Sequence, residues 1–190
     1  MWMHPDYANQ YPTCVKLLQT LPVKVKKTKI LDAFLTACSA GAPKPALAKT
    51  IALTQALKWG AGPSIIVKDG LLTVPTGGGE IGHACGYHSS FDKAFNPKAK
   101  SKILITSFWF DGVEFGSPAD QPKNEHRLTT TFLHEAVHWV REEAGAPDEV
   151  DLSYREPPKE AGHYFEELAF GISNVCTNAE IWDALLSRRL

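Results

Sequence analysis

The hydrophobic positions of the first 60 residues recur at the spacing of amphipathic helices. Apolar side chains repeat every three or four residues in segments 28–40 and 46–59. Such a repeat places the apolar residues on one face of a helix. Gly41 and Gly60 follow the two segments, and glycine is favoured just beyond the end of a helix. The sequence therefore predicts two helices in this part of the chain.

The middle of the chain has the shorter apolar runs that are typical of β-strands. Residues 64–68 and 71–74 are separated by Asp69-Gly70, a pair that favours a two-residue turn, so these runs predict a β-hairpin. Residues 102–110 are rich in β-branched and aromatic side chains, which favour strands. They predict a third strand.

Two longer segments between these runs predict loops. Residues 75–90 are rich in glycine and irregular, and no Gly-Lys-Ser/Thr follows the glycines, so the segment is not a P-loop. Its His83 and His88 could line a cleft or bind a second metal, although exposed loop histidines are the simpler interpretation. Residues 111–125 predict a second long loop.

The chemistry of the chain is indicated by His134-Glu135-Ala136-Val137-His138. Residues four positions apart lie on one face of a helix, so both histidines of this H-E-x-x-H motif can bind one zinc ion. Glu135 is then placed to act as a general base. Apolar residues at helical spacing flank the motif, and Gly145 and Pro147 follow it, which predicts a helix that ends there. Residues 157–171 and 178–189 predict the last two helices.

Composition indicates one globular domain over residues 1–190, with a helical part (1–60), a part with the sheet and long loops (61–125) and catalytic helices (126–190). The net charge of −1 gives no reason to expect nucleic acid as a partner. No apolar run approaches the ~18 residues of a membrane span. No Sec signal is expected, because no basic segment precedes an apolar one at the start. The four cysteines are widely spaced; buried thiols are favoured over two disulfides.

A catalytic zinc site needs a third protein ligand and an open position. No histidine follows at the spacing of the metzincin class, so that class is excluded. The downstream candidates for the third ligand are Glu156, Glu160, His163, Glu166 and Glu167. On a helix, Glu160, His163, Tyr164 and Glu167 would share one face and Glu166 would point away from it.

The combination of Leu-His-Glu-Ala-Val-His-Trp with Glu-Ala-Gly-x-x-Phe-Glu-x-x-x-Phe-Gly, over residues 133–171, resembles the metallopeptidase toxin domains of bacterial polymorphic toxins and type VI secretion effectors. These are zincins of the gluzincin type. The resemblance implies that Glu160, the first glutamate of the second motif, is the third zinc ligand. It also implies an α+β, zincin-like fold in which a small, mainly antiparallel sheet packs on the H-E-x-x-H helix, with the N-terminal helices added.

The activity expected on this basis is hydrolysis of peptide bonds by a zinc-activated water, with Glu135 as the general base. Glu167 is expected to orient a ligand histidine, with Glu166 as the alternative. The oxyanion of the transition state needs a further donor; Tyr154, Tyr164, His163 and His126 are chemically suitable. Residues 102–110 are the expected edge strand that aligns an extended substrate.

The resemblance further implies a protein or peptide substrate, a cognate immunity protein and export as part of a longer carrier. The toxin would act in the periplasm or cytoplasm of a target cell. Two alternatives stay open, namely a zinc amidase that cleaves cell-wall peptide cross-links and an inactive zincin that serves as a binding module. The intact Glu135 favours an enzyme, because a binding module has no need of the base.

Overall fold

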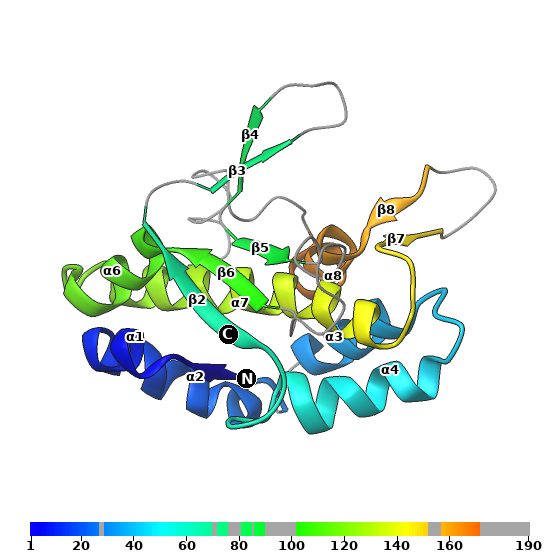
Figure 1. Ribbon diagram of the computed structural model, residues 1–190, viewed down its shortest axis with the longest axis horizontal. Coiled ribbons are helices and arrows are strands. Elements are labelled where there is room, and N and C mark those ends of the chain that lie inside the picture. The colour runs from blue at the N-terminus through cyan, green and yellow to red at the C-terminus, as the bar shows by residue number, and fades with distance from the viewer. Residues whose placement is uncertain are drawn as a thin grey trace.

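The computed structural model describes residues 1–26, 29–69, 72–75, 81–84, 86–89, 102–151 and 157–171 (Figure 1). Helices dominate the described residues, and three small sheets accompany them, so the fold belongs to the α+β class as expected. The helices are α1 (Pro5–Gln10), α2 (Pro12–Val25), α3 (Lys29–Ser39), α4 (Pro45–Ile51), the π-helical turn η1 (Ala52–Ala56), α6 (Ser107–Phe115), α7 (Gln121–Glu143) and α8 (Ala161–Phe170).

The largest sheet has the strand order β1-β2-β6-β5. Two further sheets contain two strands each, β3 with β4 and β7 with β8. The strands are β1 (Trp2–Met3), β2 (Ser64–Lys68), β3 (Leu72–Pro75), β4 (Ile81–Ala84), β5 (Gly86–Ser89), β6 (Lys102–Thr106), β7 (Glu149–Val150) and β8 (Lys159–Glu160). Within the largest sheet, β1 and β6 both run parallel to β2, and only β5 is antiparallel to its neighbour β6. The expectation of a mainly antiparallel sheet is therefore wrong for this sheet.

The predicted helices of the N-terminal part are confirmed. Segment 28–40 forms α3, and segment 46–59 forms α4, which continues as η1. The last helix of the described residues, α8, occupies the C-terminal part of segment 157–171, while segment 178–189 lies outside the described residues. The helical period of the apolar residues predicted these helices correctly because each helix buries one apolar face against the core.

The predicted hairpin at Asp69-Gly70 is wrong. β2 pairs with β1 and β6, whereas β3 pairs with β4 in a separate sheet. Ile65 and Val67 of β2 are buried, as are Ile103 and Ile105 of β6. Short continuous apolar runs of this kind are typical of buried parallel strands, and parallel strands need a long crossover between them instead of a tight turn.

The predicted strand 102–110 is a strand only as far as Thr106. The hydroxyl of Thr106 accepts a hydrogen bond from the backbone N–H of Phe108 at 3.4 Å and thereby caps α6. In addition, β6 lies between β2 and β5. It is therefore an interior strand, and the expectation that it is the edge strand that aligns a substrate is wrong.

The two predicted loops contain regular elements. β4 and β5 lie within segment 75–90, and most of segment 111–125 belongs to α6 and α7. The side chains of His83 and His88 are outside the described part of the chain. Of the four cysteines, Cys14 and Cys38 are buried free thiols, and burial raises the pKa of both. The other two cysteines are outside the described residues.

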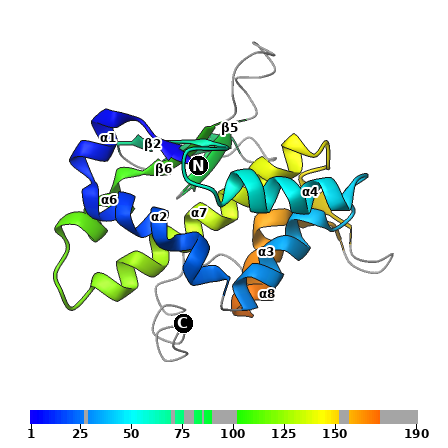
Figure 2. The same ribbon diagram turned by 90° about the horizontal axis from the view of Figure 1, so that it is seen from below.

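Helix α7 is the central element of the fold. It contacts β5 and β6 of the largest sheet as well as α2, α3, α6 and α8 (Figure 1). Its C-terminal half is buried all round, with apolar side chains and the polar residues Glu135, His138 and Arg141 among the buried ones. A view from below shows α3 and α8 side by side next to this half of α7 (Figure 2). The rings of Phe34 and Phe165 meet edge to face between α3 and α8. No helix among the described residues is long and apolar enough to cross a membrane.

Candidate metal centre

Helix α7 carries His134 and His138 one turn apart, with their ring centroids separated by 5.1 Å. The helix ends as the sequence predicts, since Gly145 follows it with a φ of 68°, a left-handed conformation that favours glycine. The side chains of both histidines are largely shielded from solvent. Two imidazoles on one buried face are thus available to a single ion.

Each histidine is held by a carboxylate at its Nδ1 atom. Nδ1 of His134 lies 2.9 Å from Oε1 of Glu166, and Nδ1 of His138 contacts Oδ1 of Asp148. An ionised carboxylate only accepts hydrogen bonds, so Nδ1 of each ring donates. When such a ring is neutral, as it is when it binds a metal, its Nε2 atom is left as the electron-pair donor. This is the tautomer that a histidine needs to bind a metal through Nε2.

Glu160 supplies a carboxylate next to both Nε2 atoms. Its Oε2 is 3.6 Å from Nε2 of His134, and its Oε1 contacts Nε2 of His138. Glu160 is also the N-cap of α8, because its carboxylate accepts the backbone N–H groups of Gly162 and His163, both at 2.8 Å. The start of α8 therefore fixes the position and orientation of this carboxylate.

Gly162 allows α8 to approach α7 closely. A Cβ atom at this position would lie 2.4 Å from Nε2 of His134, which is far inside van der Waals contact. The absence of a side chain at Gly162 is therefore a requirement for the contact between the start of α8 and the His134 ring.

Glu135 is buried beside the two histidines, with 6% of its surface exposed. Burial raises the pKa of Glu135, and the nearby His134 and His138 offset only part of this effect. Burial by itself would also raise the pKa of Glu160, but the hydrogen bond from His138 and the charges of both histidines lower it. The two carboxyl groups are thus shifted in opposite directions, and Glu135 is the one that takes up a proton more readily.

The pKa of both histidines is raised. Burial alone would lower the pKa of His134, but its hydrogen bond to Glu166 and the charges of Glu135 and Glu160 outweigh that effect. For His138 the hydrogen bonds to Asp148 and Glu160 act in the same way, and its pKa lies well above the usual value. The centre is therefore rich in negative charge, which suits a divalent cation.

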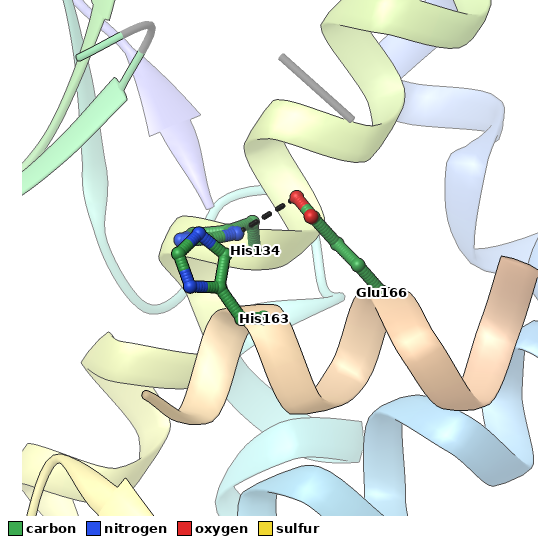
Figure 3. Close-up of side chains that lie close together, drawn as sticks. All are labelled: His134, His163 and Glu166. Carbon is green, nitrogen blue, oxygen red and sulfur yellow. Dashed lines mark hydrogen bonds and ion pairs between the residues drawn. The ribbon is translucent and has the colours of Figure 1, made fainter. Parts of the chain in front are cut away.

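The other candidates named from the sequence have different surroundings. Glu166 points at His134 from α8, and His163 lies beside the same ring, one turn earlier (Figure 3). Nδ1 of His163 is 3.2 Å from Oε2 of Glu160. Glu167 instead pairs with Lys159 at 2.6 Å, and Tyr164 packs against the hydrophobic core. His126 is buried with its ring against Phe170, and Tyr154 and Glu156 are outside the described residues.

Two residues at this centre were not anticipated from the sequence, namely Asp148 and Gly162. The rule that a ligand histidine donates its second nitrogen to a carboxylate predicts that such partners exist. It does not say which of the many acids fills the role. Helical geometry favoured Glu167 over Glu166, but the crossing of α8 over α7 brings the Glu166 carboxylate to His134.

Among the described residues, two overlapping groups of three could hold a metal ion, with ligand atoms within 4.8 Å of one another. One contains His134, His138 and Glu160, and the other contains His134, His163 and Glu166. Two imidazoles and one carboxylate form a donor set of catalytic zinc sites. In the first group both Nδ1 atoms are already bonded to carboxylates, so the Nε2 atoms and Glu160 remain for the ion. The first group therefore fits zinc better than the second.

Largely shielded histidines held by carboxylates, a neighbouring buried glutamate and an α+β framework define the kind of centre found in metal-dependent hydrolases. Comparison with known families is consistent with this class: the chain belongs to the metallopeptidase toxin 3 family, whose model matches residues 7–171. The match runs from within α1 to the end of α8 and contains every described residue of the centre. Neither a curated protein nor a solved structure is similar enough to this chain to be matched to it. Membership makes the chain a metallopeptidase toxin domain and implies a metal cofactor.

Proposed function

We propose that the chain is a zinc metallopeptidase that hydrolyses peptide bonds of a protein substrate and acts as a secreted antibacterial toxin. The observation that carries this proposal is the convergence of His134, His138 and Glu160, whose ligand atoms lie within 4.8 Å of one another. Two of these residues come from α7, and the third begins α8. Zinc held there would polarise the scissile carbonyl and lower the pKa of a water molecule towards ~7.

Glu135 is the proposed general base. It takes the proton of the attacking water and passes it to the nitrogen of the leaving amine, so the reaction consumes no net proton at this group. Its burial supports this role, because burial raises the pKa of Glu135 and a base works best when its pKa is near the working pH.

His163 is the proposed donor to the oxyanion that forms from the carbonyl oxygen. It lies at the start of α8, its ring is 5.3 Å from that of His134, and its Nδ1 is next to Glu160. The side chain is also partly exposed, so a substrate can reach it. Tyr164 is less suited to this role because it packs against the core.

The substrate is proposed to bind as an extended segment along β5. This strand is last in the order β1-β2-β6-β5 and contacts α7. Among the described strands, therefore, β5 has one side that is unpaired in this sheet. An extended peptide can add to such an edge through main-chain hydrogen bonds.

The test of the proposed function is hydrolysis of casein and of a peptide library by the zinc-loaded protein and by its Glu135→Gln variant. Loss of the general base should lower kcat by roughly 10²–10⁴-fold, while the zinc content stays that of the wild type. Glu167→Gln is a matched control on α8, because the Glu167 carboxylate pairs with Lys159. Full activity in Glu135→Gln would contradict the mechanism, and cleavage of peptidoglycan cross-links without cleavage of proteins would make the enzyme an amidase.

The toxin role is supported by the family and is tested in cells. The chain is expressed in a bacterial host with and without an added export signal. Growth of the host should stop when the chain is directed to the compartment that contains its substrate. Glu135→Gln should be harmless in both compartments. Equal growth arrest by the wild type and Glu135→Gln would mean that toxicity does not depend on hydrolysis.

A further inference from the structure

Arg141 is a fully buried arginine in the last turn of α7, three residues after His138. A buried charge is costly unless its polar atoms are satisfied. The guanidinium donates from Nε to the carbonyl of Pro147 at 2.8 Å and from Nη2 to that of Glu149 at 3.2 Å. Nη1 donates to the carbonyls of Ala37 and Ala40 at 2.9 and 2.7 Å. The planar fork of arginine can reach several acceptors in fixed directions.

Two of these carbonyls belong to the residues on either side of Asp148. The guanidinium thus holds the backbone before and after the residue whose carboxylate contacts Nδ1 of His138. The Asp148 side chain itself is 66% exposed, so packing does little to fix it. The backbone that carries this side chain therefore sets the position from which the carboxylate reaches His138.

The same turn is tied to the start of α8. The carbonyl of Asp148 accepts the N–H of Ala161 at 3.0 Å, and Glu149 pairs with Glu160 in the ladder of β7 and β8. The carboxylates of Asp148 and Glu160 therefore come from neighbouring backbone segments. Both contact the ring of His138, one at each nitrogen.

The other end of the guanidinium binds the C-terminal end of α3. Ala37 is near the end of this helix and Ala40 follows it, where helix carbonyls lack partners within the helix and a cation is favoured. Arg141 therefore links three pieces of backbone, namely the end of α3, the end of α7 and the turn around Asp148. Since α3 also packs on α8, this link connects the turn around Asp148 with α3, α7 and α8.

We propose that Arg141 is a positioning residue of the metal centre: it fixes the backbone on both sides of Asp148 so that the Asp148 carboxylate holds His138 with Nε2 turned towards the metal. The proposal rests on the zinc site of the proposed function. It assigns a role at the centre to a residue that touches neither metal nor substrate.

The test is the zinc affinity of the metal-free protein, measured by competition with a chromophoric chelator, together with the visible spectrum of the cobalt(II) form. Arg141→Lys keeps the charge, but a single ammonium group cannot span the four carbonyls. We expect Arg141→Lys and Asp148→Asn each to weaken zinc binding about 10-fold, within the range for groups that orient a ligand, and to shift the cobalt spectrum. Because Arg141 acts through Asp148, the double variant should lose no more than about 10-fold as well.

Arg127→Lys is the matched control, since Arg127 lies on the same helix with its guanidinium 5.1 Å from the centre of the Trp109 ring. This variant should keep the zinc affinity and the cobalt spectrum of the wild type. All affinities are measured at a temperature where circular dichroism shows each protein to be folded. A residue that only stabilises the fold would change the melting temperature and leave the cobalt spectrum as it is.

Wild-type zinc affinity in Arg141→Lys would overturn the proposal, and so would losses that multiply to about 100-fold in the double variant. If Arg141→Lys does not fold, Asp148→Asn serves as the test, because the exposed Asp148 side chain can be replaced without disturbing the core. Unchanged zinc affinity in Asp148→Asn would overturn the role of Arg141 and leave the proposed function standing. A wild-type protein that binds no zinc would overturn this proposal and the proposed function together. Zinc binding without peptidase activity would count against the proposed function only.

Discussion

His134 and His138 lie one turn apart on the same helix, yet the carboxylates that hold them sit in opposite surroundings. Glu166, the partner of His134, comes from α8 and is 2% exposed. Asp148, the partner of His138, lies in the turn after α7 with a side chain that is 66% exposed. One histidine therefore depends on the packing of two helices, and the other depends on the conformation of a turn.

This difference has an electrostatic consequence. A hydrogen bond between charged groups is stronger where water is excluded, and a missing partner there costs more. Around an exposed carboxylate, water and salt take over part of the interaction. We therefore expect the centre to be more sensitive to changes on the His134 side than on the His138 side.

The largest effect on zinc affinity is expected from Gly162→Ala, which disturbs the packing around His134. The added Cβ would lie 2.4 Å from Nε2 of His134, so either the ring or α8 must move. We predict a loss of zinc affinity of roughly 100-fold or more, at or beyond the upper end for disturbed ligand support. Overpacking should also lower the free energy of unfolding by about 1–3 kcal/mol. Chelator competition and denaturant titration measure the two quantities.

Gly112→Ala is the control for this substitution. A Cβ at Gly112 would meet the side chain of Asn124 at 3.1 Å, which is away from the two histidines. Its zinc affinity should equal that of the wild type. A zinc affinity in Gly162→Ala equal to that of the wild type would mean that zinc binding does not need the close contact of α8 with His134.

The next largest effects are expected from replacing the two carboxylates that hold the histidines. Glu166→Gln and Asp148→Asn both remove a charge and keep the shape of the side chain. We predict that zinc binding weakens towards 100-fold in the first variant and about 10-fold in the second. The loss in Asp148→Asn should shrink further in high salt, whereas the loss in Glu166→Gln should not. A larger loss in Asp148→Asn would reverse the comparison between buried and exposed support.

The smallest effect on the metal centre is expected from replacing His126, a third histidine of α7. His126 is buried, and its burial lowers its pKa to about 4, whereas the pKa of His134 and His138 is raised. Because the folded pKa of His126 is below the unfolded value of about 6.5, its neutral form stabilises the fold above that pH. This stability, up to ~3 kcal/mol, is lost as the pH falls from about 6.5 to 4.

His126→Phe keeps a ring beside Phe170 and removes the titration. With chelator present, the free energy of unfolding of the wild type should fall relative to that of the variant as the pH falls from 7 to 4, because only the wild type loses the contribution of His126. The zinc affinity at pH 7 should stay as in the wild type. If the difference between the two free energies of unfolding stays constant over this pH range, protonation of the buried His126 does not destabilise the fold.

The sequence allowed helices α3, α4 and α8, the part of α7 that carries the H-E-x-x-H motif, and the family to be predicted, because each rests on a local pattern. The period of the apolar residues in α3, α4 and α7 records burial of a helix face, and glycine at position 145 marks the end of α7. Glu160 could be proposed because the resemblance covers the start of α8. These inferences needed no knowledge of which segments meet in space.

The sheet and the support of the centre depend on contacts between distant segments, so they could not be predicted. The run 64–68 is compatible with a hairpin or with a buried parallel strand, and only its pairing with β1 and β6 decides between them. Asp148 is one acid among many in the C-terminal half, and its role appears only when the turn folds back on His138. Gly162 resembles any small residue in a helix until α8 is placed against α7.

The binding of zinc by His134, His138 and Glu160 is tested by the zinc content of the purified wild type, Glu160→Gln and Glu167→Gln, measured by elemental mass spectrometry. Glu160→Gln keeps an oxygen that can cap α8 but loses the carboxylate, while Glu167→Gln changes the same helix at its pair with Lys159. We predict one zinc ion per chain in the wild type and in Glu167→Gln, and a strongly reduced content in Glu160→Gln. Full zinc in Glu160→Gln, or no zinc in the wild type even after reconstitution, would contradict this prediction.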